Sequence, residues 1–184
     1  MPRISAIDPA SAAANARPLL DAARAQLGAA PNFIRVLAHS PKALEGFLGL
    51  HGAAAGFAID NATRERIALT VAEGNACQYC VAAHTAIGRH AGLSEAEMQL
   101  NRRGTAGDAR DAAAVALARA INDNLGEITD REFDAARDAG LGDAELVEII
   151  TLVALNIFTN LIGKATRVEI DFPRVALLPG ARAA

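Results

Sequence analysis

The spacing of apolar residues along the chain predicts helices throughout. Leu44, Phe47 and Leu48 recur at intervals of three and four, which places them on one face of a helix that begins at Pro41. Residues 146–158 are apolar with few interruptions, which predicts a helix buried almost all round. No segment alternates polar and apolar residues between turn signals, so strands are not expected. The pattern predicts an all-α protein.

Capping residues mark where these helices begin and end. Ser, Thr, Asp and Asn side chains accept hydrogen bonds from the free N–H groups of a first helical turn. Two pairs of residues have the spacing of a capping box, and Gly140 suits the position just after a helix. The expected caps are Ser40, Asp60-Asn61, the pair Ser94 and Glu97, and the pair Thr129 and Glu132.

Composition narrows the class of protein. The 184 residues are 52% hydrophobic but only 4% aromatic, so Ala, Leu, Ile and Val must build the core. The net charge is −3 and the basic residues are spread along the chain, so the sequence predicts no basic patch that would bind nucleic acid. The N-terminus lacks the apolar region of a secretory signal, and residues 146–158 are too few to span a bilayer. We therefore expect a cytoplasmic protein with no membrane partner.

The chain divides into three parts. Residues 1–30 are expected to form an N-terminal helical arm and residues 31–168 the main helical domain. Residues 169–184 contain two prolines among apolar residues and do not resemble a helix. Such a tail packs on its own domain or on a neighbouring subunit, and the pattern slightly favours the subunit.

Both cysteines of the chain lie in the segment EGNACQYCVAAH, residues 73–84. Gly74 suits the end of one helix and Asn75 the N-cap of the next, which places Cys77 in a first helical turn. Free N–H groups and the helix dipole favour a thiolate there. In the cytoplasm a CxxC pair is more often redox-active or metal-binding than structural.

Helical spacing brings a histidine to the same face. Cys77 and Cys80 are three residues apart, and His84 follows Cys80 by four, so the three side chains are neighbours. A neutral imidazole can deprotonate a thiol near physiological pH. Glu65 and Glu73 lie on the preceding helix, where either carboxylate can orient His84 or take its proton.

Less chemical interpretations of the same residues remain open. Both thiols can be packed and inert, because free cysteine is often buried. A structural zinc site needs four ligands, and only His84 and His90 lie nearby, so no metal is expected. His39 and His51 stand alone in apolar segments and are interpreted as core or surface histidines. Tyr79 is expected to pack in the interior, and an orientation with its hydroxyl toward the site stays open.

The segment TRERIALTVAEGNACQYCVAAHTAIGRHAGLS resembles the alkylhydroperoxidase D (AhpD)-like, carboxymuconolactone decarboxylase superfamily. The shared signature is Glu65, eleven residues, then the CxxCxxxH motif from Cys77 to His84. Looser likeness extends over residues 31–173, and the IDFP tail is similar to the branch of peroxidase-related proteins. The resemblance implies an AhpD-like helical bundle that assembles into a trimer or hexamer.

The resemblance also implies roles for the site residues. Cys80 would be the peroxidatic thiol, Cys77 the resolving thiol, His84 the base, and Glu65 the far end of a proton relay. Well-known members carry a second histidine where this chain has Tyr79, so Glu73 is expected to share the relay. The implied activity is thiol-dependent reduction of hydroperoxides, with an external lipoyl or thioredoxin-like dithiol as reductant and no cofactor.

Three other functions stay open. A thiol–disulfide oxidoreductase or redox sensor would use the same cysteine pair on a protein partner. A lactone decarboxylase would not need the pair, so its presence argues against that activity. A non-enzymatic helical assembly module would hold thiols that react no faster than free cysteine.

Overall fold

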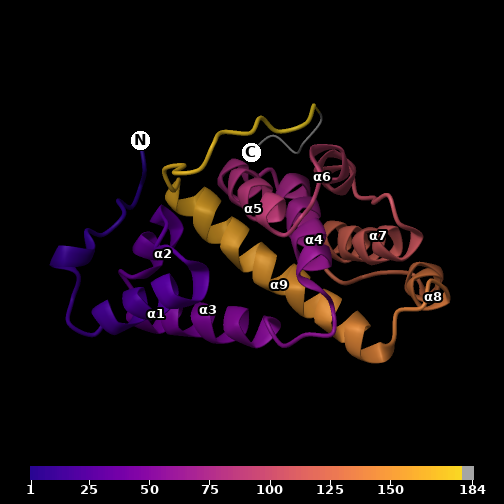
Figure 1. Cartoon of the computed structure of the whole chain (residues 1–184), viewed down its shortest axis with the longest axis horizontal. Coiled ribbons are helices and arrows are strands. Elements are labelled where there is room, and N and C mark those ends of the chain that lie inside the picture. The colour runs from indigo at the N-terminus through magenta and orange to yellow at the C-terminus, as the bar shows by residue number, and fades with distance from the viewer. Residues whose placement is uncertain (180–184) are drawn as a thin grey trace.

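The computed structural model describes residues 1–179, and all regular secondary structure within them is helical. A long helix, α9, crosses the molecule, with α1–α3 on one side and α4–α7 on the other (Figure 1). The all-α prediction is confirmed. The elements are the 3₁₀ turn η1 (Pro9–Ser11), α1 (Arg17–Leu27), α2 (Asn32–Leu37), α3 (Pro41–Ala54), α4 (Asn61–Gly74), α5 (Gln78–His90), α6 (Glu95–Arg102), α7 (Ala109–Asn124), α8 (Asp130–Asp138) and α9 (Asp143–Thr166).

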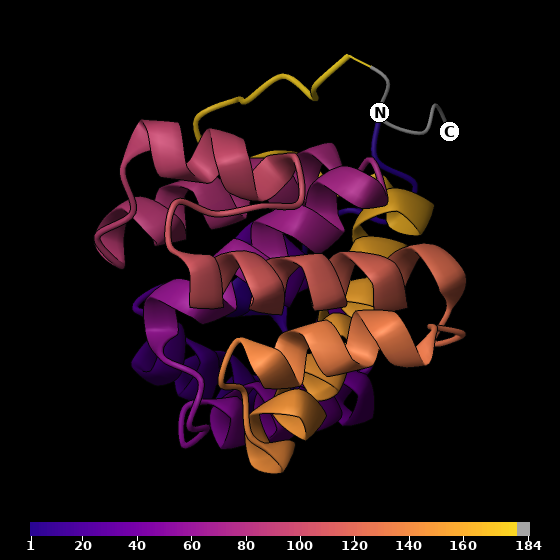
Figure 2. The ribbon, with the colours of Figure 1, turned by 90° about the vertical axis from the view of Figure 1, so that its right-hand side faces the viewer.

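Helices α4 and α9 organise the packing. Each contacts the other, and α4 also packs on α5, α6 and α7, while α9 also packs on α3, α5 and α7. One apolar cluster joins α1, α2, α3 and α5 to the C-terminal half of α9, and both cysteines belong to it. A second cluster joins α4, α7 and α8 to the N-terminal half of α9. Figure 2 shows α7 and α8 side by side on the face of that second cluster.

Most expected caps form. Ser40 and Asp60 cap α3 and α4, and Thr129 and Glu132 make a complete capping box at α8. Gly140 takes a positive φ of 89° directly after the C-cap of α8, as expected. Ser94 caps α6, but the Glu97 side chain bonds Arg66, Asn101 and Gly107 instead of returning to the cap. Only half of that capping box exists.

Helix α9 differs from the sequence prediction in two ways. It has 24 residues, far more than the apolar core of residues 146–158, and is the one helix of residues 1–179 long and apolar enough to cross a membrane. It packs on four other helices, as the core helix of a bundle does. It is not buried all round, since Val147, Ile150 and Leu161 are 62%, 42% and 64% exposed. These three exposed residues are named the α9 stripe below.

Both ends of the chain pack on the main domain. Leu20 and Ala23 of α1 lie in the same core cluster as the cysteines, so the predicted arm is part of the core. Ile170, Phe172 and Leu177 of the tail pack on that cluster as well. The described part of the tail therefore contacts its own domain, and residues 180–184 of the predicted tail lie outside the described residues.

Candidate active site

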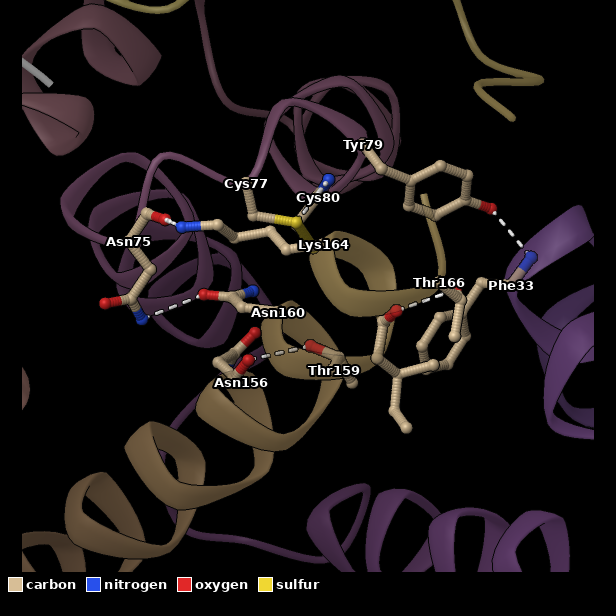
Figure 3. The surroundings of a disulfide bond; sticks show 11 residues. Phe33, Asn75, Cys77, Tyr79, Cys80, Asn156, Thr159, Asn160, Lys164 and Thr166 are labelled. Carbon is tan, nitrogen blue, oxygen red and sulfur yellow. Dashed lines mark hydrogen bonds between the residues drawn. A yellow bond between two sulfur atoms is a disulfide. The ribbon is translucent and has the colours of Figure 1, made fainter. Parts of the chain in front are cut away.

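Cys77 and Cys80 form a disulfide at the N-terminus of α5, with their Cα atoms 5.3 Å apart. The two residues are 1% and 4% exposed. The pair lies between α5 and α9 (Figure 3). A dithiol that closes into a disulfide inside one helical turn can donate two electrons without a large movement of the backbone.

The backbone at the cysteines departs from the sequence prediction. Asn75 is the C-cap of α4 and not the N-cap of α5, and Ala76 takes the left-handed conformation that follows it, with φ 51°. The N–H groups of Ala76 and Cys77 return to the carbonyls of Glu73 and Ala72 at 2.9 Å, which is the Schellman arrangement. This ending makes Cys77 itself the N-cap of α5.

As the N-cap, Cys77 receives a hydrogen bond from the helix. The backbone N–H of Cys80 donates to the Cys77 sulfur, with 3.4 Å between the nitrogen and the sulfur. Side chains at this position accept bonds that the first helical turn cannot make internally. When the disulfide is reduced, the same amide and the helix dipole favour the thiolate form of Cys77.

Gly163 of α9 forms the floor of the site. A Cβ atom at this position would lie 3.3 Å from the Cys77 sulfur and 3.6 Å from the Cys80 sulfur. Glycine thus lets the backbone of α9 touch the disulfide. Sequence reasoning did not identify Gly163, because a glycine within an apolar helix carries no sign of what packs against it.

His84 and Glu65 form a hydrogen-bonded pair, with 2.8 Å between Nδ1 of His84 and Oε2 of Glu65. The side chains are 20% and 12% exposed, so the pair is half-buried but reached by solvent. A carboxylate can only accept, so Nδ1 of a neutral ring carries the hydrogen and Nε2 keeps a free lone pair. His84 follows Cys80 by one turn on the same helix face. This arrangement can supply a base beside a thiol.

Glu73 does not join that pair. Its Oε2 accepts from Nε of Arg102 at 2.7 Å, and its Oε1 accepts from the backbone N–H of Leu178 at 2.6 Å. The side chains of Glu73 and Arg102 are 5% and 3% exposed. Arg102 also donates to the carbonyl of Ala176. The expected share of Glu73 in the relay is thus replaced by a structural role, since both of its oxygens hold Arg102 and the tail.

Tyr79 likewise turns away from the cysteines. Its hydroxyl donates to Oδ1 of Asp171 at 3.0 Å and accepts from the backbone N–H of Phe33 at 3.1 Å. Burial raises the pKa of this phenol strongly, and the Asp171 carboxylate adds to the rise. Figure 3 shows the ring directed toward Phe33 rather than toward the disulfide. Tyr79 therefore fixes the IDFP segment and cannot replace a relay histidine.

His51 lies closer to this chemistry than the sequence suggested. Its Nδ1 is 3.4 Å from Nε2 of Gln26, and its ring is 5.4 Å from the ring of Phe47. Burial lowers the pKa of His51, and the charges of Glu65 and His84 also act on it, the first raising and the second lowering it. His51 is therefore an electrostatic neighbour of the Glu65–His84 pair. Nothing in its sequence context indicated this.

Across residues 1–179 no group of three or more His, Cys, Asp or Glu side chains is arranged to hold a metal ion. The site consists of the cysteine pair, the Glu65–His84 pair and the α9 backbone at Gly163. A cysteine pair and a histidine on one helix, with a glutamate hydrogen-bonded to the histidine, are the kinds of group that thiol chemistry with a general base uses.

Comparison with known proteins finds a family model that matches part of the chain. A family model described as the carboxymuconolactone decarboxylase family matches residues 41–123, which include the whole site except α9. A search of curated proteins finds no match.

Solved structures share the fold over most of the chain. A peroxidase-related protein with an alkylhydroperoxidase AhpD core from Ralstonia eutropha JMP134 is similar with a TM-score of 0.82, 22% identity and coverage of 92% of both chains. A peroxidase-related protein from Silicibacter sp. TM1040 is similar with a TM-score of 0.77 and 21% identity, over 90% of this chain and 91% of the other. The debrominase Bmp8, as a C82A variant in complex with 2,3,4-tribromopyrrole, is similar with a TM-score of 0.78 and 19% identity over 91% of each chain. The family match over residues 41–123 and these shared folds together support the AhpD-like, carboxymuconolactone decarboxylase superfamily that the motif predicted.

Proposed function

We propose that this protein is a thiol-dependent peroxidase that reduces hydroperoxides through the Cys77–Cys80 pair. One observation carries the proposal: the first turns of α5 hold both the Cys77–Cys80 disulfide and His84, whose ring is hydrogen-bonded to Glu65. The fold likeness to peroxidase-related proteins agrees with it. We place the enzyme in the cytoplasm, where a reduced dithiol is maintained.

The first half of the cycle consumes the peroxide. Nε2 of His84 takes the thiol proton of Cys80, and the thiolate attacks the distal oxygen of ROOH. The S–O bond forms, the O–O bond breaks, and the leaving alkoxide takes the proton back from His84 as ROH. Glu65 holds the ring in the tautomer that this transfer requires. Cys80 is left as a sulfenic acid.

The second half restores the disulfide and then the dithiol. The Cys77 thiolate attacks the sulfenic sulfur, the S–S bond forms, and hydroxide leaves and is protonated to water. An external dithiol reduces the disulfide by thiol–disulfide exchange. Because the cysteines are 1% and 4% exposed, a slender lipoyl arm fits this step better than the broad face of a thioredoxin-like protein.

A kinetic comparison of variants tests the assignment. Cys80→Ser should abolish turnover of tert-butyl hydroperoxide. His84→Ala should slow turnover by about 10²–10⁴-fold, and Glu65→Gln should slow it by a smaller factor. His90→Ala is the matched control, because His90 is exposed on the same helix and its Nδ1 lies 2.8 Å from the carbonyl oxygen of Ala86. Unchanged turnover in Cys80→Ser would refute the peroxidase. Faster reaction with a protein disulfide than with the peroxide would favour a thiol–disulfide oxidoreductase or sensor instead.

The likeness to a debrominase favours a second candidate function, reductive debromination, in which the same cysteine pair supplies the two electrons. A thiolate can attack the bromine of a brominated pyrrole, so that the carbon takes a proton and the sulfur carries bromine. The second thiolate then displaces bromide and closes the disulfide. Phe33 and Tyr79 lie in the core cluster of the cysteines and give it an aromatic character. Release of bromide from 2,3,4-tribromopyrrole, faster than peroxide turnover, would select this candidate.

We propose further that the chain forms a homo-oligomer, a trimer or hexamer, through the α9 stripe. Val147, Ile150 and Leu161 recur at helical spacing on the exposed side of α9, and they are 62%, 42% and 64% exposed. Apolar side chains grouped on one face commonly mark a protein interface. No nucleic acid or membrane partner is proposed.

A further inference from the structure

Asn160 on α9 has a buried hydrogen-bond donor without an acceptor. The residue is 2% exposed, and its Nδ2 has no partner among the described residues. Buried polar groups are nearly always paired, so an exception calls for a physical reason. In Figure 3 Asn160 lies on α9 below the cysteine pair.

The orientation of this amide is fixed by its neighbours. Nδ2 of Asn75 donates both of its hydrogens, one to Oδ1 of Asn122 at 2.8 Å and one to Oδ1 of Asn160 at 3.0 Å. Oδ1 of Asn75 in turn accepts from Nδ2 of Asn122. Nδ2 of Asn122 also donates to the carboxylate of Asp123, which can only accept, and this sets the orientation of all three amides. Asn160 must therefore present its oxygen to Asn75 and its NH₂ group to the other side. Rotating the amide would place two donors against each other.

The helix that carries Asn160 touches the sulfurs one turn later. Gly163 brings the α9 backbone into contact with the disulfide, and a Cβ there would lie closest to Cys77, at 3.3 Å. The next residue, Lys164, donates from Nζ to the carbonyl of Asn75 at 2.6 Å, beside the cysteine pair (Figure 3). A donor and a cation of α9 thus border the loop that leads into Cys77.

A disulfide sulfur carries no charge and is a weak acceptor, so the donor has little to bind in the oxidised protein. Reduction changes this, because a thiolate accepts strongly and needs several donors when it is buried. The N–H of Cys80 already supplies one donor to the Cys77 sulfur. A second donor from α9 would add to it.

We propose that Asn160 donates a hydrogen bond to the Cys77 sulfur when the pair is reduced, and so holds Cys77 as the thiolate that closes the disulfide. The assignment rests on the proposed peroxidase cycle, in which Cys77 attacks the sulfenic acid of Cys80. It separates the two thiols: Asn160 and the helix N-terminus serve Cys77, and the Glu65–His84 pair serves Cys80. Asn160 is a positioning residue that prepares the second chemical step.

The test measures the pKa of Cys77 alone, in a full-length Cys80→Ser background, from the pH dependence of its alkylation by iodoacetamide. Asn160→Leu keeps the shape of the side chain and removes the donor. It should raise the pKa of Cys77 by about 1–2 units, the effect of one hydrogen bond to a charged group. Asn160→Met, which is unbranched and adaptable, replaces the Leu variant where that variant does not fold.

Asn156→Leu is the matched control. Asn156 is a buried asparagine one turn earlier on α9, and its Nδ2 is satisfied by the carbonyl of Leu152 at 2.8 Å. The inference holds if the pKa of Cys77 rises in the Asn160 variants and stays constant in Asn156→Leu. An unchanged pKa in the Asn160 variants overturns it, as does an equal rise in the control.

The consequence for the cycle is measured separately, in the chain with both cysteines. If the Cys77 thiolate is depleted, the sulfenic acid of Cys80 survives longer and excess peroxide oxidises it to the sulfinic acid. Mass spectrometry should find more sulfinic Cys80 in Asn160→Leu than in Asn156→Leu, and equal amounts would contradict the proposal. Because the pKa is measured without peroxide, a chain inactive as a peroxidase would leave that first test intact.

Discussion

Replacing Glu73 with Gln removes one charge from an ion pair that water hardly reaches. The side chains of Glu73 and Arg102 are 5% and 3% exposed, and 2.7 Å separates Nε of Arg102 from Oε2 of Glu73. Gln keeps the shape but only one accepting oxygen, so it leaves an unbalanced charge on Arg102 and turns its NH₂ group toward one of the two donors that Glu73 binds. Breaking a buried pair in this way costs about 3–5 kcal/mol of the free energy of unfolding.

Urea unfolding followed by circular dichroism at one protein concentration measures this cost. For an m-value of about 2 kcal/mol/M, the unfolding midpoint of Glu73→Gln should fall by roughly 1.5–2.5 M. Glu95→Gln is the control, because Glu95 pairs with Arg89 at 2.9 Å but both side chains are about half exposed, at 59% and 49%. A surface pair contributes about 0–1 kcal/mol, so that midpoint should move by less than about 0.5 M.

Two results would refute this reasoning. The first is a midpoint for Glu73→Gln that equals that of the control, since the pair would then contribute no more than a surface pair. The second is a Glu73→Gln protein of normal stability that has lost peroxide turnover, because Glu73 would then belong to the proton relay. The double variant Glu73→Gln with Arg102→Met should recover part of the loss, because no buried charge remains unpaired.

Three further predictions follow from single contacts. Gly163→Ala places a methyl group 3.3 Å from the Cys77 sulfur and should destabilise the oxidised protein by about 1–3 kcal/mol, measured by thermal unfolding. Gly49→Ala is the control: Gly49 has open space around it, so this variant should stabilise the protein. Leu161→Glu puts a charge in the α9 stripe and should yield a smaller species in size-exclusion chromatography with light scattering; an unchanged mass would exclude the stripe as the interface. Burial alone would raise the pKa of Glu97, but hydrogen bonds from Arg66, Asn101 and the Gly107 amide outweigh it and lower that pKa below its ordinary 4.5. The stability that Glu97 contributes is therefore present above pH 4.5 and lost as the pH falls through the lower folded pKa, so Glu97→Gln should be less sensitive to pH in acid unfolding, and parallel profiles would contradict this.

Features set by local sequence were predictable. Helix caps such as Asp60 and Thr129 act within three residues, so spacing alone locates them. The spacing from Cys80 to His84 also lies within one helix. The CxxCxxxH motif with its upstream Glu65 carried the resemblance to the superfamily, which the family match over residues 41–123 supports. The hydrogen bond between Glu65 and His84 joins two helices. The position of the glutamates on the preceding helix left Glu65 and Glu73 as alternatives, and the family resemblance favoured Glu65 as the end of the relay.

Features set by tertiary contacts were not predictable. The N-cap shifted from Asn75 to Cys77 because α4 ends in a Schellman turn with Ala76, a non-glycine residue, in the left-handed position. Glu73 was expected in the relay because it lies one turn before Cys77, but it binds Arg102 from α6, which no local pattern indicates. The contact of Gly163 with the disulfide depends on how α9 crosses α5.

Single-turnover stoichiometry tests the central claim most directly. The fully reduced protein is mixed with one equivalent of tert-butyl hydroperoxide, and the remaining thiols and the intact mass are measured. The account predicts the loss of both thiols for each peroxide consumed and a mass lower by two hydrogens, while Cys80→Ser keeps its single thiol on the same timescale. Loss of thiols at the rate of free cysteine, or equal loss in Cys80→Ser, would contradict it.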